Sequence, residues 1–216
     1  MHLSERILFI DAEALVLDKP AGLPVDAPRR GGDSIEARIH ELKCGFKRPP
    51  TAMHRLDTDT SGCLLFARTP KARTELQQLF ETRRVEKYYL AVVATEIVDE
   101  EGVIDVPLAK RSSAEAGWRM VADDHGLSAT THWRRIAVRG GLTFVEFRPL
   151  TGRTHQIRAH AREAFGRGIV GDRVYGVPGG PMLLHASRLV VPRERKAMID
   201  VTAPLPDTFA EWRDVA

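Results

Sequence analysis

The stretch His54–Gly62 reads His-Arg-Leu-Asp-Thr-Asp-Thr-Ser-Gly and gathers side chains that can do chemistry. It holds one guanidinium, two carboxylates and three hydroxyls, and the apolar run Cys63–Ala67 follows it. A carboxylate on a loop beside a rigid strand is held in place while it stays open to a substrate. The same residue types also form ordinary polar turns, in which Asp and Thr side chains bond their own backbone. This stretch alone leaves both interpretations open.

Calcium binding is the first alternative, because Asp57, Asp59, Ser61 and Gly62 match the first half of an EF-hand loop. That loop requires a bidentate glutamate at its twelfth position, where this chain has Arg68. An apolar run follows instead of a helix, so the sequence argues against calcium.

A second alternative is a hydrolase that uses Asp57 and Asp59 as a carboxylate pair. The two residues are too close in one short loop to flank a scissile bond, and no partner that would raise one pKa is evident. A third alternative comes from residues 166–171, which read Gly-Arg-Gly-Ile-Val-Gly. A dinucleotide-binding motif must follow a strand and open a helix, whereas this run follows a predicted helix.

Composition bounds the class of protein. The 216 residues are 43% hydrophobic and 28% charged, as in a globular protein with a real core. The net charge of +3 suits a polyanion such as RNA, although an ordinary arginine-rich surface explains it equally well. No apolar run is long enough to cross a membrane, and Met1–Arg6 lacks the core of a secretory signal. We therefore expect a cytoplasmic protein.

The cysteines and histidines of the sequence do not have the spacing of metal ligands. Cys44 and Cys63 are too few for a disulfide framework or a zinc site, and we expect two buried thiols. His155 and His160 are five residues apart, which is poor spacing for two ligands on one helix face. The sequence predicts neither metal nor cofactor.

Hairpin signals dominate over any strict alternation of strand and helix, which favours an α+β fold with a mainly antiparallel sheet and flanking helices. Helices are predicted from residues 33 or 34 to 42, over 71–84, from a cap at Thr154, and near the C-terminus around Phe209 and Trp212. Strands are predicted over residues 7–10, 14–18, 63–67, 85–93, 102–107, 130–138, 142–150, 169–175, 182–191 and 197–201.

Three segments outside the central stretch carry further polar groups. Lys19 stands where a strand ends, before a loop rich in proline and glycine. In the strand over residues 85–93, period-two alternation places Tyr88 and Tyr89 on opposite faces. The polar excursion over residues 110–127 contains basic residues and Trp118, which fits either a nucleic-acid contact or a surface loop.

Taken together, these pieces resemble the RluA-type family of RNA pseudouridine synthases over nearly the whole chain. The matching motifs occur in the family's order along the chain: Lys19–Val25, His54–Gly62, the strand of Tyr89, Thr151–His160, Gly171–Gly176 and Leu184–Ala186. The resemblance implies isomerisation of uridine in RNA to pseudouridine, in the family's catalytic fold with a central cleft.

The resemblance also implies roles for individual residues. Asp57 falls on the essential carboxylate, Tyr89 on the tyrosine beside the flipped base, and Arg158 on the arginine that pairs with that carboxylate. Arg55 is implied to fill the space that the extruded base leaves, because a planar guanidinium can stack there. Whether Asp57 attacks the base, attacks the sugar or removes a proton from C2′ stays open.

We expect the remaining substrate contacts from the same motifs, and Lys19 to act behind them or on a phosphate. Asp59 is expected to organise its loop and not to catalyse. The expected RNA-contacting residues are Arg55, His54, Thr60, Lys19, Arg153, His155 and Gln156.

Relatives often carry an N-terminal RNA-binding domain, whereas this chain is expected to be a single catalytic domain over residues 1–216. We expect a monomer whose partner is a stem-loop of transfer RNA or of large-subunit ribosomal RNA. The competing hypothesis is an RNA-binding chaperone or assembly factor that does not depend on catalysis.

Overall fold

The computed structural model describes residues 2–113 and 117–216. The chain forms two compact units, one comprising Met1–Lys87 and Ala186–Pro204, the other Tyr88–His185 and Leu205–Ala216. Each unit has a buried apolar core of its own. The single catalytic domain expected over residues 1–216 stays a prediction.

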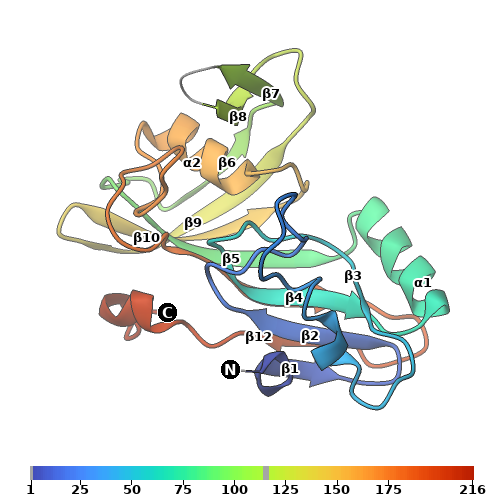
Figure 1. Cartoon of the computed structure of the whole chain (residues 1–216). Helices are drawn as coiled ribbons and strands as arrows, with labels where there is room; N and C mark the ends of the chain where they lie inside the picture. The colour runs from blue at the N-terminus through green and yellow to red at the C-terminus, as the bar shows by residue number, and fades with distance from the viewer. Residues whose placement is uncertain (1, 114–116) are drawn as a thin grey trace. The chain divides into compact units, whose positions relative to one another are not determined.

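The first unit is built on a sheet, labelled in Figure 1, in which β2 pairs antiparallel with both β1 and β4. The strand order is β1 (Ile7–Ile10), β2 (Ala14–Lys19), β4 (Ser61–Ala67) and β11 (Leu184–Val191, from Ala186 on in this unit). Off this path, β12 (Ile199–Thr202) pairs antiparallel with β11. The short β3 (Thr51–Ala52) also pairs with β4, and the unit contains η1 (Leu3–Arg6), η2 (Ile39–Leu42) and α1 (Pro70–Glu81).

Helix α1 forms where the sequence predicts a helix, and its start shows why. The Thr69 hydroxyl accepts a hydrogen bond from the Ala72 amide, and Pro70 occupies the first turn, where it needs no amide partner. The helix buries Ala72 and Leu76 in a core that includes Leu65 of β4. Burying one leucine side chain stabilises a fold by roughly 1.5–3 kcal/mol, so this stripe holds the helix on the sheet.

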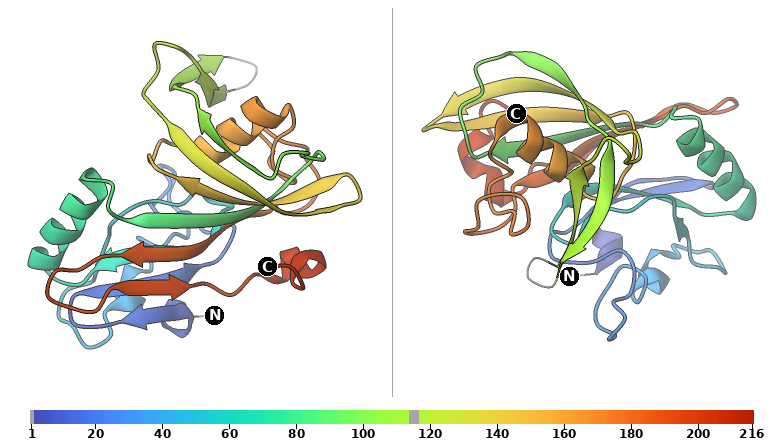
Figure 2. Two further views of the ribbon diagram at one scale, coloured as in Figure 1. Left: turned by 180° about the vertical axis from the view of Figure 1, so that it is seen from behind. Right: turned by 90° about the horizontal axis from the view of Figure 1, so that it is seen from above.

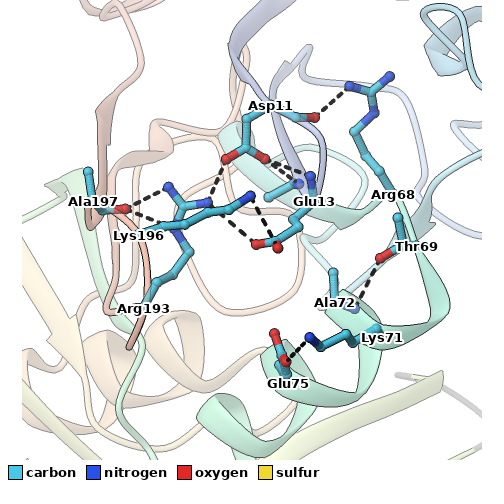
Figure 3. Close-up of polar contacts among 11 residues, drawn as sticks. Asp11, Glu13, Arg68, Thr69, Lys71, Ala72, Glu75, Arg193, Lys196 and Ala197 are labelled. Carbon is cyan, nitrogen blue, oxygen red and sulfur yellow. Dashed lines mark hydrogen bonds and ion pairs between the residues drawn. The ribbon is translucent and has the colours of Figure 1, made fainter.

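The loop after β11 is tied back to the β1–β2 turn, as Figure 3 shows. Arg193 donates from Nη1 to the Asp11 carboxylate at 2.6 Å and from Nε to the Ala197 carbonyl at 2.8 Å. Arg68 donates to the Asp11 carbonyl at 2.6 Å. A groove of about 470 Å³ lies between α1 and residues 192–196, and none of the predicted site residues lines it.

The main sheet of the second unit contains, in this order, β5 (Glu86–Val93, from Tyr88 on in this unit), β10 (Leu142–Pro149), β9 (Thr130–Arg139) and β6 (Glu101–Asp105). Neighbouring strands in this order pair antiparallel. Gly140 and Gly141 join β9 to β10 with φ of 56° and 77°, as a two-residue hairpin turn requires. Figure 2 shows this long hairpin in yellow and orange with α2 (Gln156–Phe165) beside it. The unit ends with η3 (Asp207–Trp212).

The alternation predicted for β5 is confirmed. Tyr89, Ala91 and Val93 belong to one apolar cluster, while Leu90 and Val92 belong to another. Tyr89 therefore has the opposite orientation to its neighbours in the strand. The prediction of an α+β fold with a mainly antiparallel sheet is confirmed as well.

The polar excursion over residues 110–127 is largely a ribbon of two strands and not a loop. β7 (Leu108–Ser113) pairs antiparallel with β8 (Gly117–Ala122). Residues 114–116 of the excursion lie outside the described residues. Among the described positions of the two strands only Leu108 and Met120 are buried, so the apolar alternation that signals a strand is too weak to detect.

Two other expectations about secondary structure are wrong. Only Ile39–Leu42 of the helix predicted up to residue 42 is helical, as a 3-10 turn, because few apolar side chains support it. Residues 169–175 make isolated bridges and no strand, since Asp172 accepts from the Val174 and Tyr175 amides in a turn. The short helix predicted around Phe209 and Trp212 is confirmed, as the 3-10 helix η3.

In the described parts of the chain, every helix is too short or too polar to cross a bilayer. Cys63 is buried as expected, and burial raises the pKa of its thiol to about 12. Cys44 is exposed, which corrects the expectation of two buried thiols.

Candidate active site

The loop that carries Asp57 is a tight turn held at both ends. The Thr60 amide donates to the Asp57 carbonyl at 3.1 Å, and the Gly22 amide donates to the Thr58 carbonyl at 2.9 Å. Leu56 on one side and Thr60 on the other are buried, while Asp57 itself is half-buried. The main chain of Asp57 is therefore fixed by hydrogen bonds of its own turn and of the loop that contains Gly22.

Lys19 fixes this loop from beneath. Its side chain is completely buried, and Nζ donates to the carbonyls of Pro20 and Leu23 at 2.8 Å each and of Thr58 at 3.0 Å. Burial lowers the pKa of Lys19 to about 8, against the opposing charges of Asp59, Asp57 and Asp18. A fully buried ammonium whose three donors are all used by main-chain carbonyls cannot reach a phosphate, so the expected RNA contact of Lys19 is corrected to a role behind the loop.

His54 faces inward as well. Its Nε2 accepts a hydrogen bond from the Leu65 amide of β4 at 3.1 Å, and its ring lies 5.4 Å from that of Phe80. The ring lies beneath the surface, although the residue as a whole is half-buried. Burial lowers its pKa to about 3, and the charge of Lys87 acts in the same direction. The acceptor nitrogen of His54 already binds β4, and its expected RNA contact stays a prediction.

Gly62 ends the loop at a point of close backbone approach. Its φ is +105°, and a Cβ there would lie 2.2 Å from the Ala186 carbonyl oxygen. Only glycine fits this position, so the last residue of the motif brings β4 against β11.

Arg55 is the cation of the motif that faces solvent. Its side chain is 75% exposed and pairs with Asp26 at 2.6 Å. Such an exposed pair is worth little, so it opens at low cost when a larger anion arrives. Its implied role at the extruded base stays a prediction. Thr60 is buried, so its expected RNA contact is corrected to an anchor of the turn.

Tyr89 belongs to the other unit. It lies half-buried on β5, opposite Phe147 of β10, and packs against the core cluster that contains Ala91. One part of the Tyr89 side chain therefore packs against the core, and another part is accessible to solvent. Its implied position beside the uracil stays a prediction.

Arg158 makes a buried ion pair that the sequence analysis missed. Its Nε donates to Asp172 Oδ2 at 2.7 Å and its Nη2 to Oδ1 at 2.8 Å. Burial alone would raise the pKa of Asp172, but the hydrogen bonds and charge of Arg158, with the amides of Val174 and Tyr175, lower it instead. The pairing of Arg158 with Asp57 involves residues of different units and stays a prediction. The motif Gly171–Gly176 contains Asp172 and was the signal for this partner.

Gln156 organises the segment before α2. Its Oε1 accepts from the Thr151 hydroxyl at 2.7 Å and the Arg153 amide at 2.9 Å, while its Nε2 donates to the Thr130 carbonyl and the Thr131 hydroxyl. All four hydrogen-bonding positions are used inside the protein. The expected RNA contact of Gln156 is therefore corrected.

Arg153 and His155 lie half-buried at the same segment. Arg153 donates from Nε to the Ser128 carbonyl at 3.0 Å. His155, and not Thr154 as predicted, is the N-cap residue of α2, with φ of +52° and no capping hydrogen bond from its side chain. Its ring stacks on Trp118 at 4.7 Å between centroids, and its Nδ1 lies 3.0 Å from the Tyr175 hydroxyl. Their expected contacts with RNA stay predictions.

Comparison with known proteins now adds to this geometry. A family model described as RNA pseudouridylate synthase matches residues 13–163. An uncharacterised RNA pseudouridine synthase of Zymomonas mobilis subsp. mobilis is 49% identical over 213 residues, which cover 97% of each chain. A ribosomal large subunit pseudouridine synthase D of Nitrosomonas europaea is 32% identical, across 95% of this chain and 63% of that protein.

The fold also has a close solved counterpart. Human RNA pseudouridylate synthase domain containing 4 matches with a TM-score of 0.81 and 26% identity, covering 96% of this chain and 91% of that one. The resemblance read from the motifs is thereby confirmed at the level of family and fold.

The buried ammonium predicts how stability depends on pH. The pKa of Lys19 is about 8 in the folded chain against 10.5 in the unfolded chain, so between these values the unfolded chain binds more protons. The free energy of unfolding therefore rises with pH in that window, by up to about 1.4 kcal/mol per pH unit from this group. Lys19→Met should remove that part of the slope. Urea unfolding of both proteins at several pH values measures it, and equal slopes would contradict the assignment.

The imidazole of His54 should stay neutral, with its proton on Nδ1, throughout roughly pH 5–8, because Nε2 accepts from Leu65 and the pKa is about 3. Nitrogen NMR of histidine-labelled protein reads both the charge and the tautomer. In urea-unfolded protein the same signal should titrate near 6.5. A folded-state titration near that value would show that the ring is not held as described.

Proposed function

Since the chain belongs to the RNA pseudouridylate synthase family of isomerases, we propose that it converts uridine to pseudouridine in a structured RNA and that Asp57 is the catalytic carboxylate. The position of Asp57 is the observation on which this proposal rests. It is the half-buried carboxylate of the family-matching motif, on a turn fixed by Lys19 and Thr60.

The reaction needs a uracil that stays bound and a carboxylate that is held in position. It does not need a strong acid or a strong general base. The bond between N1 and C1′ breaks, a bond between C5 and C1′ forms, the C5 proton leaves, and N1 takes a proton. Between these steps the uracil must rotate while it stays bound. Because a base cannot do this inside a stem, the nucleotide must leave the stack.

Arg55 suits the space that the flipped base leaves, and Tyr89 suits a position beside the flipped base. Arg55 is the exposed cation two residues before Asp57, and its weak pair with Asp26 leaves the guanidinium free to enter a stack. Tyr89 offers a ring that β5 and Phe147 keep in place, and a flipped base stacks on such a ring.

Arg158 would serve Asp57 through one edge of its guanidinium. Asp172 occupies the edge formed by Nε and Nη2. A guanidinium has a second edge, which can donate hydrogen bonds to another carboxylate. Such a contact would keep Asp57 ionised in a pocket that excludes water.

The β7–β8 ribbon fits a phosphate backbone. Arg111 and Arg119 stand directly opposite each other on its two strands, both exposed. Arg111 pairs with Asp123, whereas Arg119 has no ion pair with a described residue. Like charges placed opposite each other across strands are unfavourable, and a polyanion relieves that repulsion. Trp118, 43% exposed, lies with Lys110 on the same ribbon.

Large-subunit ribosomal RNA is the substrate that the relatives favour, because several of them are named as acting on the ribosomal large subunit. A stem-loop of transfer RNA has the same features of shape and charge. We further propose that the protein acts in the cytoplasm as a monomer.

Asp57→Asn should reduce pseudouridine formation by at least about 1,000-fold, because the amide cannot act as a carboxylate, while RNA binding changes little. Chemical labelling of pseudouridine in RNA from cells that lack this protein measures the product. Asp59→Asn is the matched control in the same turn and should stay active. Normal product from Asp57→Asn would remove the catalytic assignment, and RNA binding without any product from the wild type would favour the chaperone.

Arg119→Ala should weaken RNA binding and lower the slope of log K against log salt by about one unit. Arg213→Ala is the matched control, since it removes an exposed arginine of the same unit that pairs with Asp207. Binding measured at several salt concentrations separates the two variants. If both variants lowered the slope equally, the ribbon would have no special part in binding.

A further inference from the structure

The hydroxyl of Tyr175 is the meeting point of the β7–β8 ribbon and the start of α2. It accepts a hydrogen bond from the Met120 amide of β8 at 2.8 Å and lies 3.0 Å from Nδ1 of His155. Tyr175 and Met120 are both buried, in one apolar cluster with Ala159 of α2. This one hydroxyl therefore links two elements that are far apart in the sequence.

The ring of the same residue lies under Arg158. The Cζ of Arg158 is 5.2 Å from the centroid of the Tyr175 ring, within the range of a cation–π contact. The Asp172 carboxylate holds Arg158 from another side with two hydrogen bonds, and Asp172 in turn accepts from the amide of Tyr175 at 3.1 Å. Arg158, Asp172 and Tyr175 thus form a closed set of contacts.

A stack of two aromatic rings connects this set of contacts to the exposed surface of the ribbon. The rings of His155 and Trp118 lie 4.7 Å apart and 21° from parallel, and the Lys110 ammonium lies 4.9 Å from the centre of the Trp118 ring. The ring of His155 meets that of Tyr175 edge to face at 5.6 Å. An unbroken series of contacts leads from the exposed ribbon to the buried guanidinium.

We infer that Tyr175 is a positioning residue for the reaction: it sets the position of Arg158 and joins that guanidinium to the basic ribbon. The inference rests on the proposed function, in which Arg158 acts at Asp57 and the ribbon contacts RNA. RNA held by the ribbon then meets a guanidinium that is already in place. In this inference the sequence motif Gly171–Gly176 positions Arg158, through the side chains of Asp172 and Tyr175.

The physical reason is that a guanidinium acts through the direction of its N–H groups. Asp172 fixes one edge of Arg158 with two hydrogen bonds, and the Tyr175 ring packs against the face of the guanidinium, which restricts its tilt. The hydrogen bond from the Met120 amide keeps that ring from turning away. A displacement of about 1 Å in a positioned group can cost up to 100-fold in rate.

Tyr175→Phe tests the inference, because it keeps the ring and removes only the hydroxyl. We expect kcat on the RNA substrate to fall by about 10-fold while KM changes by less than about threefold. Hydrogen exchange of the Met120 amide should become faster, with the global unfolding free energy nearly unchanged. Tyr88→Phe is the matched control, since it deletes a tyrosine hydroxyl from the same unit. It should change neither kcat nor the hydrogen exchange of the Met120 amide.

The outcomes separate the inference from the proposed function. If wild-type protein makes pseudouridine and folded Tyr175→Phe has the wild-type kcat, the inference is overturned and the function stands. If wild-type protein makes none, the proposed function fails first. Should Tyr175→Phe not fold, His155→Asn carries the same test, because asparagine tolerates the φ of +52° and removes the partner of the hydroxyl. A wild-type kcat in that variant would also overturn the inference.

Discussion

One buried ammonium is the constraint on which the candidate site depends. Lys19 lies at the end of β2, has no exposed surface, and binds the carbonyls of Pro20, Leu23 and Thr58. Burying a charge is costly unless its hydrogen bonds are satisfied. The three carbonyls satisfy it only if both loops hold one shape, so the charge ties the loop after β2 to the turn that carries Asp57.

The second unit uses the same principle. Arg158 is buried, and it is stable there because Asp172 accepts two of its hydrogen bonds while backbone amides hold Asp172. In both units a buried, hydrogen-bonded charge organises a segment that bears a candidate functional residue. Such networks specify one geometry, since any other arrangement leaves a buried charge unpaired.

The sequence predicts best what depends on local pattern. The helix after Thr69, the Gly140–Gly141 hairpin and the alternation of Tyr88 and Tyr89 follow from capping, turn chemistry and strand period. The motif spelling likewise led to the correct family. These features are encoded within a few neighbouring residues, so no tertiary contact is needed to find them.

The sequence fails where a side chain's role depends on residues far along the chain. Lys19 looks like a surface lysine, because Thr58 lies 39 positions away. His54, Thr60 and Gln156 look like substrate contacts, but they bond or pack inward. Asp172 was visible only as part of a motif, without its partner. The ribbon of β7 and β8 buries too little for its period to show.

The most direct test of the central claim uses RNA whose uridines carry tritium at C5. Forming the C5–C1′ bond expels that hydrogen, so purified protein should release tritium to water in a fixed ratio to the RNA sites that it modifies. RNA from cells lacking the protein is the substrate, because its target sites are unmodified. Release that reaches a plateau at a whole number of sites is the predicted result. Folded protein that binds this RNA and releases no tritium would contradict the account.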